Sequence, residues 1–161
     1  MIRPALASDL DAMAAIAQQC FGPSAWHRSQ FVLDEPETSQ RWTLVATPDP
    51  NTATTADTAG VCVGYLVMAL ALDEAELQAL AVAHPWRNQG IGAALLTAGL
   101  TTALQRGAER VFLEVRAGNL AAQRFYQRFQ FLEFARRPHY YHEPDETAVL
   151  MRWRWTGGSG L

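Results

Sequence analysis

The stretch of residues 77–96, LQALAVAHPWRNQGIGAALL, limits the possible folds of this chain more than any other segment. Its apolar first part predicts a buried strand over 77–82, and the glycines that follow lead into an amphipathic helix over 91–106. The apolar run VFLEV at 111–115 predicts the next strand. A strand–helix–strand crossover that joins parallel strands is right-handed in nearly all proteins. The chain is therefore predicted to contain an α/β unit with a parallel strand pair.

The remaining segments surround this unit with further strands and helices. Ser8 precedes apolar residues at helical spacing and is predicted to cap a helix over 9–20. Asn119 is predicted to cap a second helix, which ends at 129. The other predicted elements are a short helix at 26–33, strands at 2–4, 41–46, 61–72, 131–136 and 148–155, a turn at 73–74 and a loop at 140–145. This order predicts a mixed α/β sheet with helices on both faces.

The chain has 161 residues, of which 49% are hydrophobic and 18% charged, so we expect one globular domain over 1–155. Residues 47–60 and 156–161 show no periodicity, and we expect a mobile hairpin connection and a disordered tail. A net charge of −3 argues against bulk electrostatic binding of nucleic acid. With no secretory signal and no long apolar run, we expect a cytoplasmic protein without membrane contact. Cys20 and Cys62 lack metal-ligand spacing and are expected to be buried, reduced thiols.

Arg87, Gly90 and Gly92 form the pattern R-x-x-G-x-G immediately before the helix at 91–106. The first turn of a helix leaves backbone N–H groups unpaired and carries roughly half a positive charge, so it attracts anions. Glycine lets phosphate oxygens approach the backbone closely, and Arg87 and Asn88 can add side-chain donors. The pattern predicts a diphosphate site that differs from dinucleotide-binding and P-loop motifs. The alternative interpretation is a turn that needs glycine only for its backbone conformation.

The segment LAVAHPWRNQGIGAALL, followed by LEVRAGNLAAQRFYQRFQF, resembles the acyl-CoA-binding half of the GCN5-related N-acetyltransferases, the GNAT superfamily. The combination L-E-V-R-x-x-N-x-x-A-x-x-x-Y with Tyr140-Tyr141 is most similar to the RimI-type ribosomal-protein alanine N-acetyltransferases. The resemblance is specific over 72–152 and looser over 1–46. It implies a mixed, mostly antiparallel twisted sheet with helices on both faces and a splayed pair of parallel central strands. It also implies an acetyl-CoA-dependent N-acetyltransferase that needs no metal.

The resemblance further implies where acetyl-CoA would bind. Its pantetheine would pair with the edge of the strand at 80–82, and its diphosphate would rest on the backbone of 88–93. Asn119 would contact the cofactor while also capping its helix. The residues that the resemblance assigns to the cofactor are Leu80, Ala81, Val82, Arg87, Asn88, Gln89, Gly90, Ile91, Gly92, Ala93, Asn119 and Tyr126.

Glu114 lies in the otherwise apolar strand at 111–115, where alternation places it on the same face as Phe112 and Arg116. One interpretation is an ion pair with Arg116. The other is a general base that takes the proton of the attacking amine through water, and the resemblance gives the matching glutamate this role. Glu76 is the rival base, because other members of the superfamily place a catalytic carboxylate near that position.

Tyr126 lies on the apolar face of the helix that follows Asn119, so it is either a core aromatic or a functional group. The resemblance implies that its hydroxyl protonates the coenzyme thiolate. Where the family usually has glycine after this helix, the chain has Gln130, and a positive φ there would cost about 1 kcal/mol. The histidines, which can titrate near neutrality, are not expected to form a metal site: His27, His84, His139 and His142.

The acceptor side is expected at Trp26, Phe31, Tyr140 and Tyr141, although Trp26 and Phe31 could equally be core residues. The leading hypothesis is acetylation of a protein or peptide α-amino group. The acceptor that the resemblance implies is the N-terminal alanine of a ribosomal protein. The alternatives are a GNAT acetyltransferase of a small amine, amino acid or antibiotic, and a non-catalytic acyl-CoA-binding regulatory module. We expect a monomer or weak dimer that binds no nucleic acid.

Overall fold

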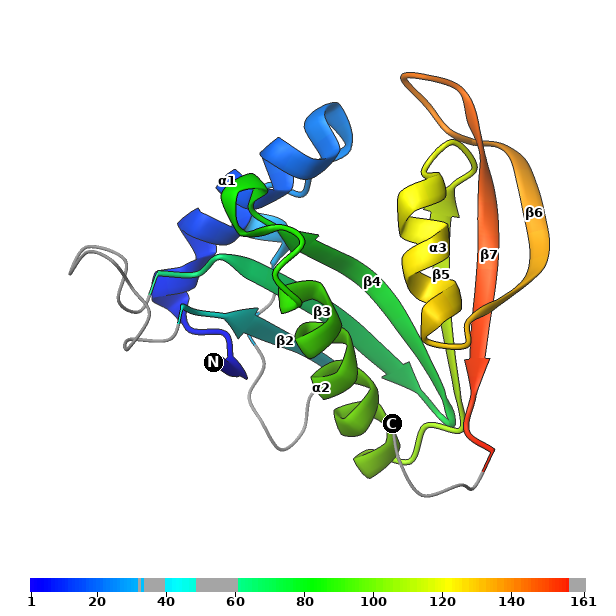
Figure 1. Ribbon diagram of the computed structural model, residues 1–161, viewed down its shortest axis with the longest axis horizontal. Coiled ribbons are helices and arrows are strands. Elements are labelled where there is room, and N and C mark those ends of the chain that lie inside the picture. The colour runs from blue at the N-terminus through cyan, green and yellow to red at the C-terminus, as the bar shows by residue number, and fades with distance from the viewer. Residues whose placement is uncertain (32, 34–39, 49–60, 157–161) are drawn as a thin grey trace.

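The computed structural model describes residues 1–31, 33, 40–48 and 61–156, and these form one twisted sheet flanked by helices (Figure 1). The sheet has seven strands in the order β1-β2-β3-β4-β5-β7-β6, and every neighbouring pair except β4–β5 is antiparallel. The strands are β1 (Ile2–Pro4), β2 (Arg41–Ala46), β3 (Gly64–Ala71), β4 (Glu74–Val82), β5 (Arg110–Arg116), β6 (Leu132–Tyr141) and β7 (Glu146–Arg154). The predicted fold class is confirmed.

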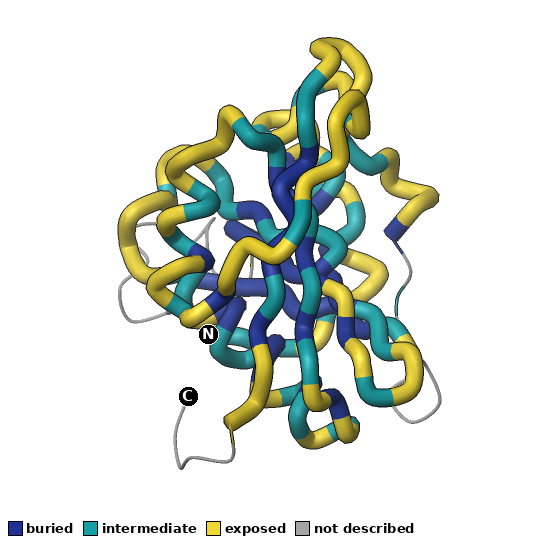
Figure 2. The backbone as a smooth tube through the Cα atoms, turned by 90° about the vertical axis from the view of Figure 1, so that its right-hand side faces the viewer, coloured by how far each residue is buried: buried dark blue, intermediate teal, exposed yellow. Residues whose placement is uncertain are grey.

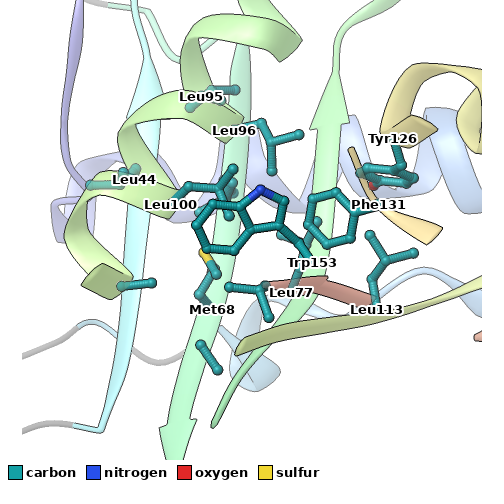
Figure 3. Close-up of a cluster of buried hydrophobic side chains, with 14 of the residues drawn as sticks. Leu44, Met68, Leu77, Leu95, Leu96, Leu100, Leu113, Tyr126, Phe131 and Trp153 are labelled. Carbon is teal, nitrogen blue, oxygen red and sulfur yellow. The ribbon is translucent and has the colours of Figure 1, made fainter. Parts of the chain in front are cut away.

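Helices cover both faces of the sheet, as predicted. Helix α1 (Leu10–Phe21) packs with the side chains of Val45, Tyr65, Val67 and Ala81 on one face. Helices α2 (Ile91–Gln105) and α3 (Leu120–Arg128) belong to a second core on the other face. Figure 3 shows part of this second core, where α2 side chains meet residues of β2, β3, β4, β5 and β7: Leu44, Met68, Leu77, Leu95, Leu96, Leu100, Leu113, Tyr126, Phe131 and Trp153.

The parallel pair β4–β5 is joined along only part of its length. Glu74–Leu77 of β4 pair with residues 110–113 of β5, and beyond this point the two strands diverge (Figure 1). A register shift in the β3–β4 ladder leaves Gln78 as an extra residue of β4, because Val67 faces Ala79 while Met68 faces Leu77. Such bulges bend a strand and increase its twist. The bulge therefore lies where β4 turns away from β5.

The start of α1 differs from the prediction. Ser8 does not cap it, because a 3₁₀ turn over Ala7–Asp9 precedes the helix. The Asp9 carboxylate accepts hydrogen bonds from the Leu6 N–H at 2.8 Å and from the Arg3 guanidinium at 2.7 Å. The buried Asp9 side chain therefore holds the turn before α1, and no side-chain hydrogen bond caps the helix itself.

The predicted helix at 26–33 is wrong. The chain after α1 forms two 3₁₀ turns, Gly22–Ser24 and Arg28–Gln30. The His27 N–H donates to the Gln30 side chain at 2.7 Å, which favours a single closed turn over a continuing helix. Val32 and residues 34–39 lie outside the described part of the chain, as do residues 49–60 of the predicted connection and 157–161 of the predicted tail.

Strand β6 is longer than predicted and reaches Tyr141, so Tyr140 and Tyr141 belong to its end rather than to a loop. Its pairing with β7 is interrupted between Glu133 and Ala135 and again between Arg137 and Tyr141, which hides the strand's periodicity in the sequence. Figure 2 shows buried backbone through the middle of the molecule and exposed backbone where the β6–β7 hairpin projects.

Short turns follow β3, α3 and α2. The turn between β3 and β4 lies at Leu72–Asp73 rather than at 73–74, and Glu74 already begins β4. Gln130 has a φ of 65°, as expected for the residue after α3, and its N–H donates to the Gln127 carbonyl at 2.9 Å. Gly107, with a φ of 91°, follows the end of α2. No helix in the described ranges is both long and apolar enough to cross a membrane.

Candidate active site

Two cavities lie where β4 and β5 diverge. The inner cavity, of about 350 Å³, is lined by Tyr65, Gln78, Glu114, Arg116 and Tyr141 among others. The outer cavity, of about 420 Å³, is lined mainly by residues between β4 and α2 together with one face of α3. Both cavities share the lining residues Cys20, Phe21, Leu80, Asn119, Ala122 and Tyr126. A linear ligand could therefore extend from one cavity into the other.

Beyond Leu77, the backbone groups of β4 that face this opening pair with no strand in the described part of the chain, although the Val82 carbonyl accepts a hydrogen bond from the Arg87 side chain. The Ala83 N–H donates to the Val63 carbonyl at 2.9 Å, so alternation turns Ala81 and Ala79 toward β3. Leu80 and Val82 therefore direct their N–H and C=O groups to the open side. Among the residues predicted to pair with pantetheine, these two can do so, whereas the Ala81 backbone pairs with β3 and its side chain is buried.

The glycine pattern forms the expected helix start. Gly90 occupies the N-cap of α2 with a left-handed φ of 79°, which agrees with the interpretation as a turn that needs glycine for its backbone conformation. No side chain caps the helix, and the first intrahelical bond runs from the Ala94 N–H to the Gly90 carbonyl at 2.9 Å. The N–H groups of Ile91, Gly92 and Ala93 therefore remain available to an anion beside the outer cavity.

The Arg87 side chain lies along the β4 edge. Its Nε donates to the Val82 carbonyl at 3.1 Å and its guanidinium donates to the Cys20 sulfur, also at 3.1 Å. Arg87 and Asn88 line the outer cavity, and Asn88 has a left-handed φ of 61°. The Gln89 side chain turns back to the Pro85 carbonyl at 3.0 Å.

Asn119 is the N-cap of α3, as predicted. Its side-chain oxygen accepts a hydrogen bond from the Ala122 N–H at 3.1 Å. Because this cap lines both cavities, one residue fixes the start of α3 and faces the space between β4 and β5. The helix that it begins carries Tyr126 about two turns later.

Glu114 lies on the β5 face that the alternation predicted. Val111, Leu113 and Val115 are buried on the opposite face, while the Glu114 side chain is 25% exposed and lines the inner cavity. Its ion-pair partner is Arg137 of β6, at 3.2 Å. The alternative interpretation, an ion pair between neighbours on β5, is wrong, because the guanidinium of Arg116 is bound to other residues.

Tyr126 is both a packed aromatic and a cavity residue. Its ring contacts Phe125 and Phe131 at centroid distances of 5.3 and 5.7 Å, and it is only 9% exposed. Burial raises the pKa of its hydroxyl well above the ordinary value, with a smaller contribution from Tyr141. The hydroxyl therefore remains protonated at neutral pH, as a proton donor requires.

Glu76, the rival base, lies outside the inner cavity. It accepts a hydrogen bond from Gln78 at 3.2 Å and lines a neighbouring groove of about 530 Å³ on the same face of the sheet. Glu114 lines this groove as well as the inner cavity, and the groove also contains Arg137. Of the two carboxylates, Glu114 alone shares a cavity with Tyr126.

The predicted acceptor residues are divided by the structure. Trp26 and Tyr141 line the inner cavity. Phe31 is 6% exposed and packs edge-on against Tyr65 at 5.2 Å, so it is a core residue beneath that wall. Tyr140 is exposed and packs edge-on against Tyr141 with the ring centroids 5.1 Å apart, and a hydrogen bond with Glu114 raises its pKa.

The sequence interpretation missed several residues that line or brace the inner cavity, chiefly Ser24, Tyr65, Gln78 and Glu146. Their positions depend on contacts between segments far apart in the chain, so no local pattern marks them. The described residues include no group of three or more His, Cys, Asp or Glu that could hold a metal ion. His139 instead pairs with Asp145 at 2.6 Å.

Comparison with known proteins agrees with this geometry. The model of the family described as "Acetyltransferase (GNAT) family" matches residues 10–131, and the chain belongs to this family. Among curated proteins, it is 36% identical over 94 residues to the [Ribosomal protein bS18]-alanine N-acetyltransferase of Escherichia coli K12. This alignment covers 57% of the chain and 64% of that relative, so the matched part spans less than two thirds of the relative's length.

Solved structures show the same fold over nearly the whole chain. The structure of the ribosomal-protein-S18-alanine N-acetyltransferase from Escherichia coli has a TM-score of 0.77 and 27% identity, and the match covers 100% of this chain and 97% of that one. Arabidopsis thaliana NAA60 in complex with acetyl-CoA has a TM-score of 0.83 at 19% identity, covering 98% and 99%. The second match shows the fold alone.

Proposed function

We propose that the protein is an acetyl-CoA-dependent N-acetyltransferase whose acceptor is the α-amino group at the N-terminus of a protein or peptide. The observation that carries this proposal is the position of Glu114 and Tyr126, which line one cavity at the opening between β4 and β5. A carboxylate can take the proton of the acceptor amine and a neutral phenol can give a proton to the leaving sulfur, so the two groups suit amide formation from an amine and a thioester. Membership of the GNAT family supports the same reaction class.

The outer cavity fits the coenzyme part of the donor. The backbone of Leu80 and Val82 can pair with the pantetheine amides as an added strand would. The unpaired N–H groups of residues 91–93 suit a diphosphate, and Asn119 faces the passage between the two cavities. Arg87 would have to leave the Val82 carbonyl if pantetheine were to use that acceptor.

The side chains of the inner cavity account for the proton transfers. Glu114 receives a proton from the acceptor ammonium through water, which leaves a neutral amine that can attack the thioester carbonyl. Tyr126 donates its hydroxyl proton to the sulfur as the carbon–sulfur bond breaks. The nitrogen loses a second proton as the tetrahedral intermediate collapses, and this proton returns to the Tyr126 oxygen through solvent. The proton on Glu114 passes to solvent, so the products are the acetylated amine, CoA and one proton, and the base and the acid are restored for the next cycle.

The relatives suggest the acceptor. The Escherichia coli relative is named for the alanine of ribosomal protein bS18, and we propose an N-terminal alanine of a ribosomal protein as the acceptor here. The inner cavity supports a residue of this kind, since aromatic side chains and small residues make up much of its wall. The groove that adjoins it offers space along the sheet for the chain that follows the first residue.

The test is a CoA-release assay with acetyl-CoA and a panel of peptides that differ in their first residue. Matched peptides with a blocked N-terminus serve as controls, and free amines and amino acids form a separate set. We expect turnover with free N-termini, highest for alanine, and none with blocked peptides. Turnover with free amines alone would reject the peptide acceptor. Tight acetyl-CoA binding without any turnover would indicate a binding module.

A further inference from the structure

Arg116, the last residue of β5, joins two walls of the inner cavity through one guanidinium. Its NH2 group donates to the Ser24 hydroxyl at 3.1 Å, in the turn that follows α1. Its NH1 group donates to the Glu146 carboxylate at 3.1 Å and to the Pro144 carbonyl at 3.4 Å. The guanidinium therefore spans the space between the turn after α1 and the β6–β7 hairpin.

The same guanidinium also holds an aromatic side chain in place. It lies 4.3 Å from the centroid of the Tyr141 ring, within the range of a cation–π contact. Tyr141 lines the inner cavity, and burial raises its pKa to about 12. Since the ring is neutral and packed against a planar cation, its position depends on where Arg116 lies.

One end of this bridge is anchored to backbone. The second oxygen of Glu146 accepts a hydrogen bond from the Gly118 N–H at 2.6 Å, in the turn between β5 and α3. A Cβ at Gly118 would lie 2.7 Å from the same oxygen, so the carboxylate fits closely against the glycine backbone. These bonds, together with that of Arg116, lower the pKa of Glu146. The other end of the bridge is a single hydrogen bond to the exposed Ser24 hydroxyl.

We propose that Arg116 is a positioning residue that sets the width of the inner cavity by holding the turn after α1 and the β6–β7 hairpin at a fixed separation. The inference rests on the proposed function, because it gives that cavity an acceptor. Arg116 lines the inner cavity but not the outer one. Its loss should therefore weaken acceptor binding and the choice among first residues, while acetyl-CoA binding changes little.

The first measurement needs no substrate. Amide hydrogen exchange is compared in wild type, Arg116→Met and Arg110→Met. Arg110 is a matched control, since it lies on the same strand and is ion-paired to Asp73 but lines neither cavity. Arg116→Met should speed exchange about fivefold or more in both 22–26 and 141–146, whereas Arg110→Met should leave these segments unchanged. Unchanged exchange in both segments of Arg116→Met would overturn the proposal.

The second measurement is kinetic. Arg116→Met should raise the acceptor KM roughly tenfold and keep the acetyl-CoA dissociation constant within about twofold of wild type. Arg116→Lys keeps the charge opposite Glu146 but cannot also reach Ser24 as a planar fork, so we expect an intermediate acceptor KM. If the acetyl-CoA dissociation constant of Arg116→Met rises as much as its acceptor KM, Arg116 has a general structural role and the proposal is rejected.

A double substitution separates the bridge from its parts. Ser24→Ala should raise the acceptor KM about twofold to threefold in wild type and add nothing in Arg116→Met, because the two residues share one contact. Full additivity would contradict the bridge. If wild type acetylates no acceptor at all, the proposed function fails, and the exchange experiment alone still decides whether Arg116 holds the two walls.

Discussion

The two cavities differ in the chemical groups that they offer a ligand. Side chains of α1 and α3 also line the outer cavity, but the groups in it that we propose to hold the coenzyme are backbone groups from nearby residues, at the free edge of β4 and in the first turn of α2, with Gly90 providing the left-handed link. The inner cavity consists of side chains from α1, β3, β4, β5, α3 and the end of β6. Backbone geometry changes little when side chains change, so the outer cavity suits an invariant ligand. The inner cavity can be altered one side chain at a time.

The largest expected effect comes from the side chain assigned as base. Glu114→Gln should slow acetyl transfer by roughly 10²–10⁴-fold at saturating substrates, because an amide cannot accept the amine proton. The acetyl-CoA dissociation constant should not change, which would place the defect in the inner cavity alone. Steady-state kinetics and calorimetric titration measure the two quantities.

Glu76→Gln is the matched control for that substitution. It removes a carboxylate of the same type from the neighbouring groove on the same sheet face. We expect the rate of acetyl transfer to fall by less than about fivefold, because a general base must lie within hydrogen-bond distance of the proton that it removes. A larger loss than that of Glu114→Gln would assign the base to Glu76.

Removal of the proposed acid should have the next largest effect. Tyr126→Phe keeps the ring that packs against Phe125 and Phe131 but deletes the hydroxyl. We expect kcat to fall by about 10²-fold, with thermal stability near that of wild type. Thioesters with a more acidic leaving thiol should recover part of the lost rate. If the more acidic leaving thiol raises the rate by the same factor in wild type and in Tyr126→Phe, the hydroxyl has another role.

A backbone change should act on the outer cavity only. Gly90→Ala places a side chain at a φ of 79° and should raise the acetyl-CoA dissociation constant about tenfold as the helix start shifts. Gly107→Ala, at the other end of α2 with a φ of 91°, introduces comparable strain away from both cavities. Each should cost about 1–2 kcal/mol of stability, but only the first should weaken binding. Equal acetyl-CoA dissociation constants in Gly90→Ala and Gly107→Ala would contradict a binding site formed by the backbone at the start of α2.

The smallest effect concerns the tyrosines. The pKa values of all four are raised: burial is the main cause at Tyr65, Tyr126 and Tyr141, and the hydrogen bond with Glu114 is the main cause at Tyr140. Stability from these groups is full below the unfolded value of about 10 and is lost as pH rises from there toward the folded values. Ultraviolet titration should therefore show little phenolate below about pH 10.

The order of ionisation tests the comparison between the cavities. The exposed Tyr140 should ionise first, then Tyr141 near pH 12, whereas Tyr126 should ionise only as the protein unfolds. Tyr141→Phe and Tyr126→Phe identify the steps. Early ionisation of Tyr126 would show that the passage between the cavities is wetter than its burial indicates.

Much of the fold could be predicted from hydrophobic periodicity and from the positions of glycines and capping residues. The strand–helix–strand unit, the glycine helix start and the Asn119 cap are local features, and the structure confirms them. The errors occurred where contacts between distant segments decide the conformation. A 3₁₀ turn held by the Arg3–Asp9 contact replaces the predicted Ser8 cap, and β6 continues through Pro138 because β7 pairs with residues on both sides of the interruption.

The candidate site divides in the same way. The backbone part could be predicted, since R-x-x-G-x-G and the strand before it specify their own geometry. The partners of Glu114 and Arg116 could not, because Arg137, Ser24 and Glu146 are 23, 92 and 30 residues away in the chain. Glu114 and Arg116 share one strand face and could have formed an ion pair. In the structure, each is instead paired with a residue of the β6–β7 hairpin.

Strand β6 has a consequence for the behaviour of the protein at high concentration. It ends the sheet, and its ladder is interrupted twice, with Pro138 offering no N–H near the second break. The Glu133–Arg136 ion pair, at 2.6 Å, adds charge along it. Interrupted and charged edges resist the addition of a strand from another molecule. The irregular pairing that conceals the full length of β6 in the sequence therefore protects the folded chain against edge-to-edge aggregation.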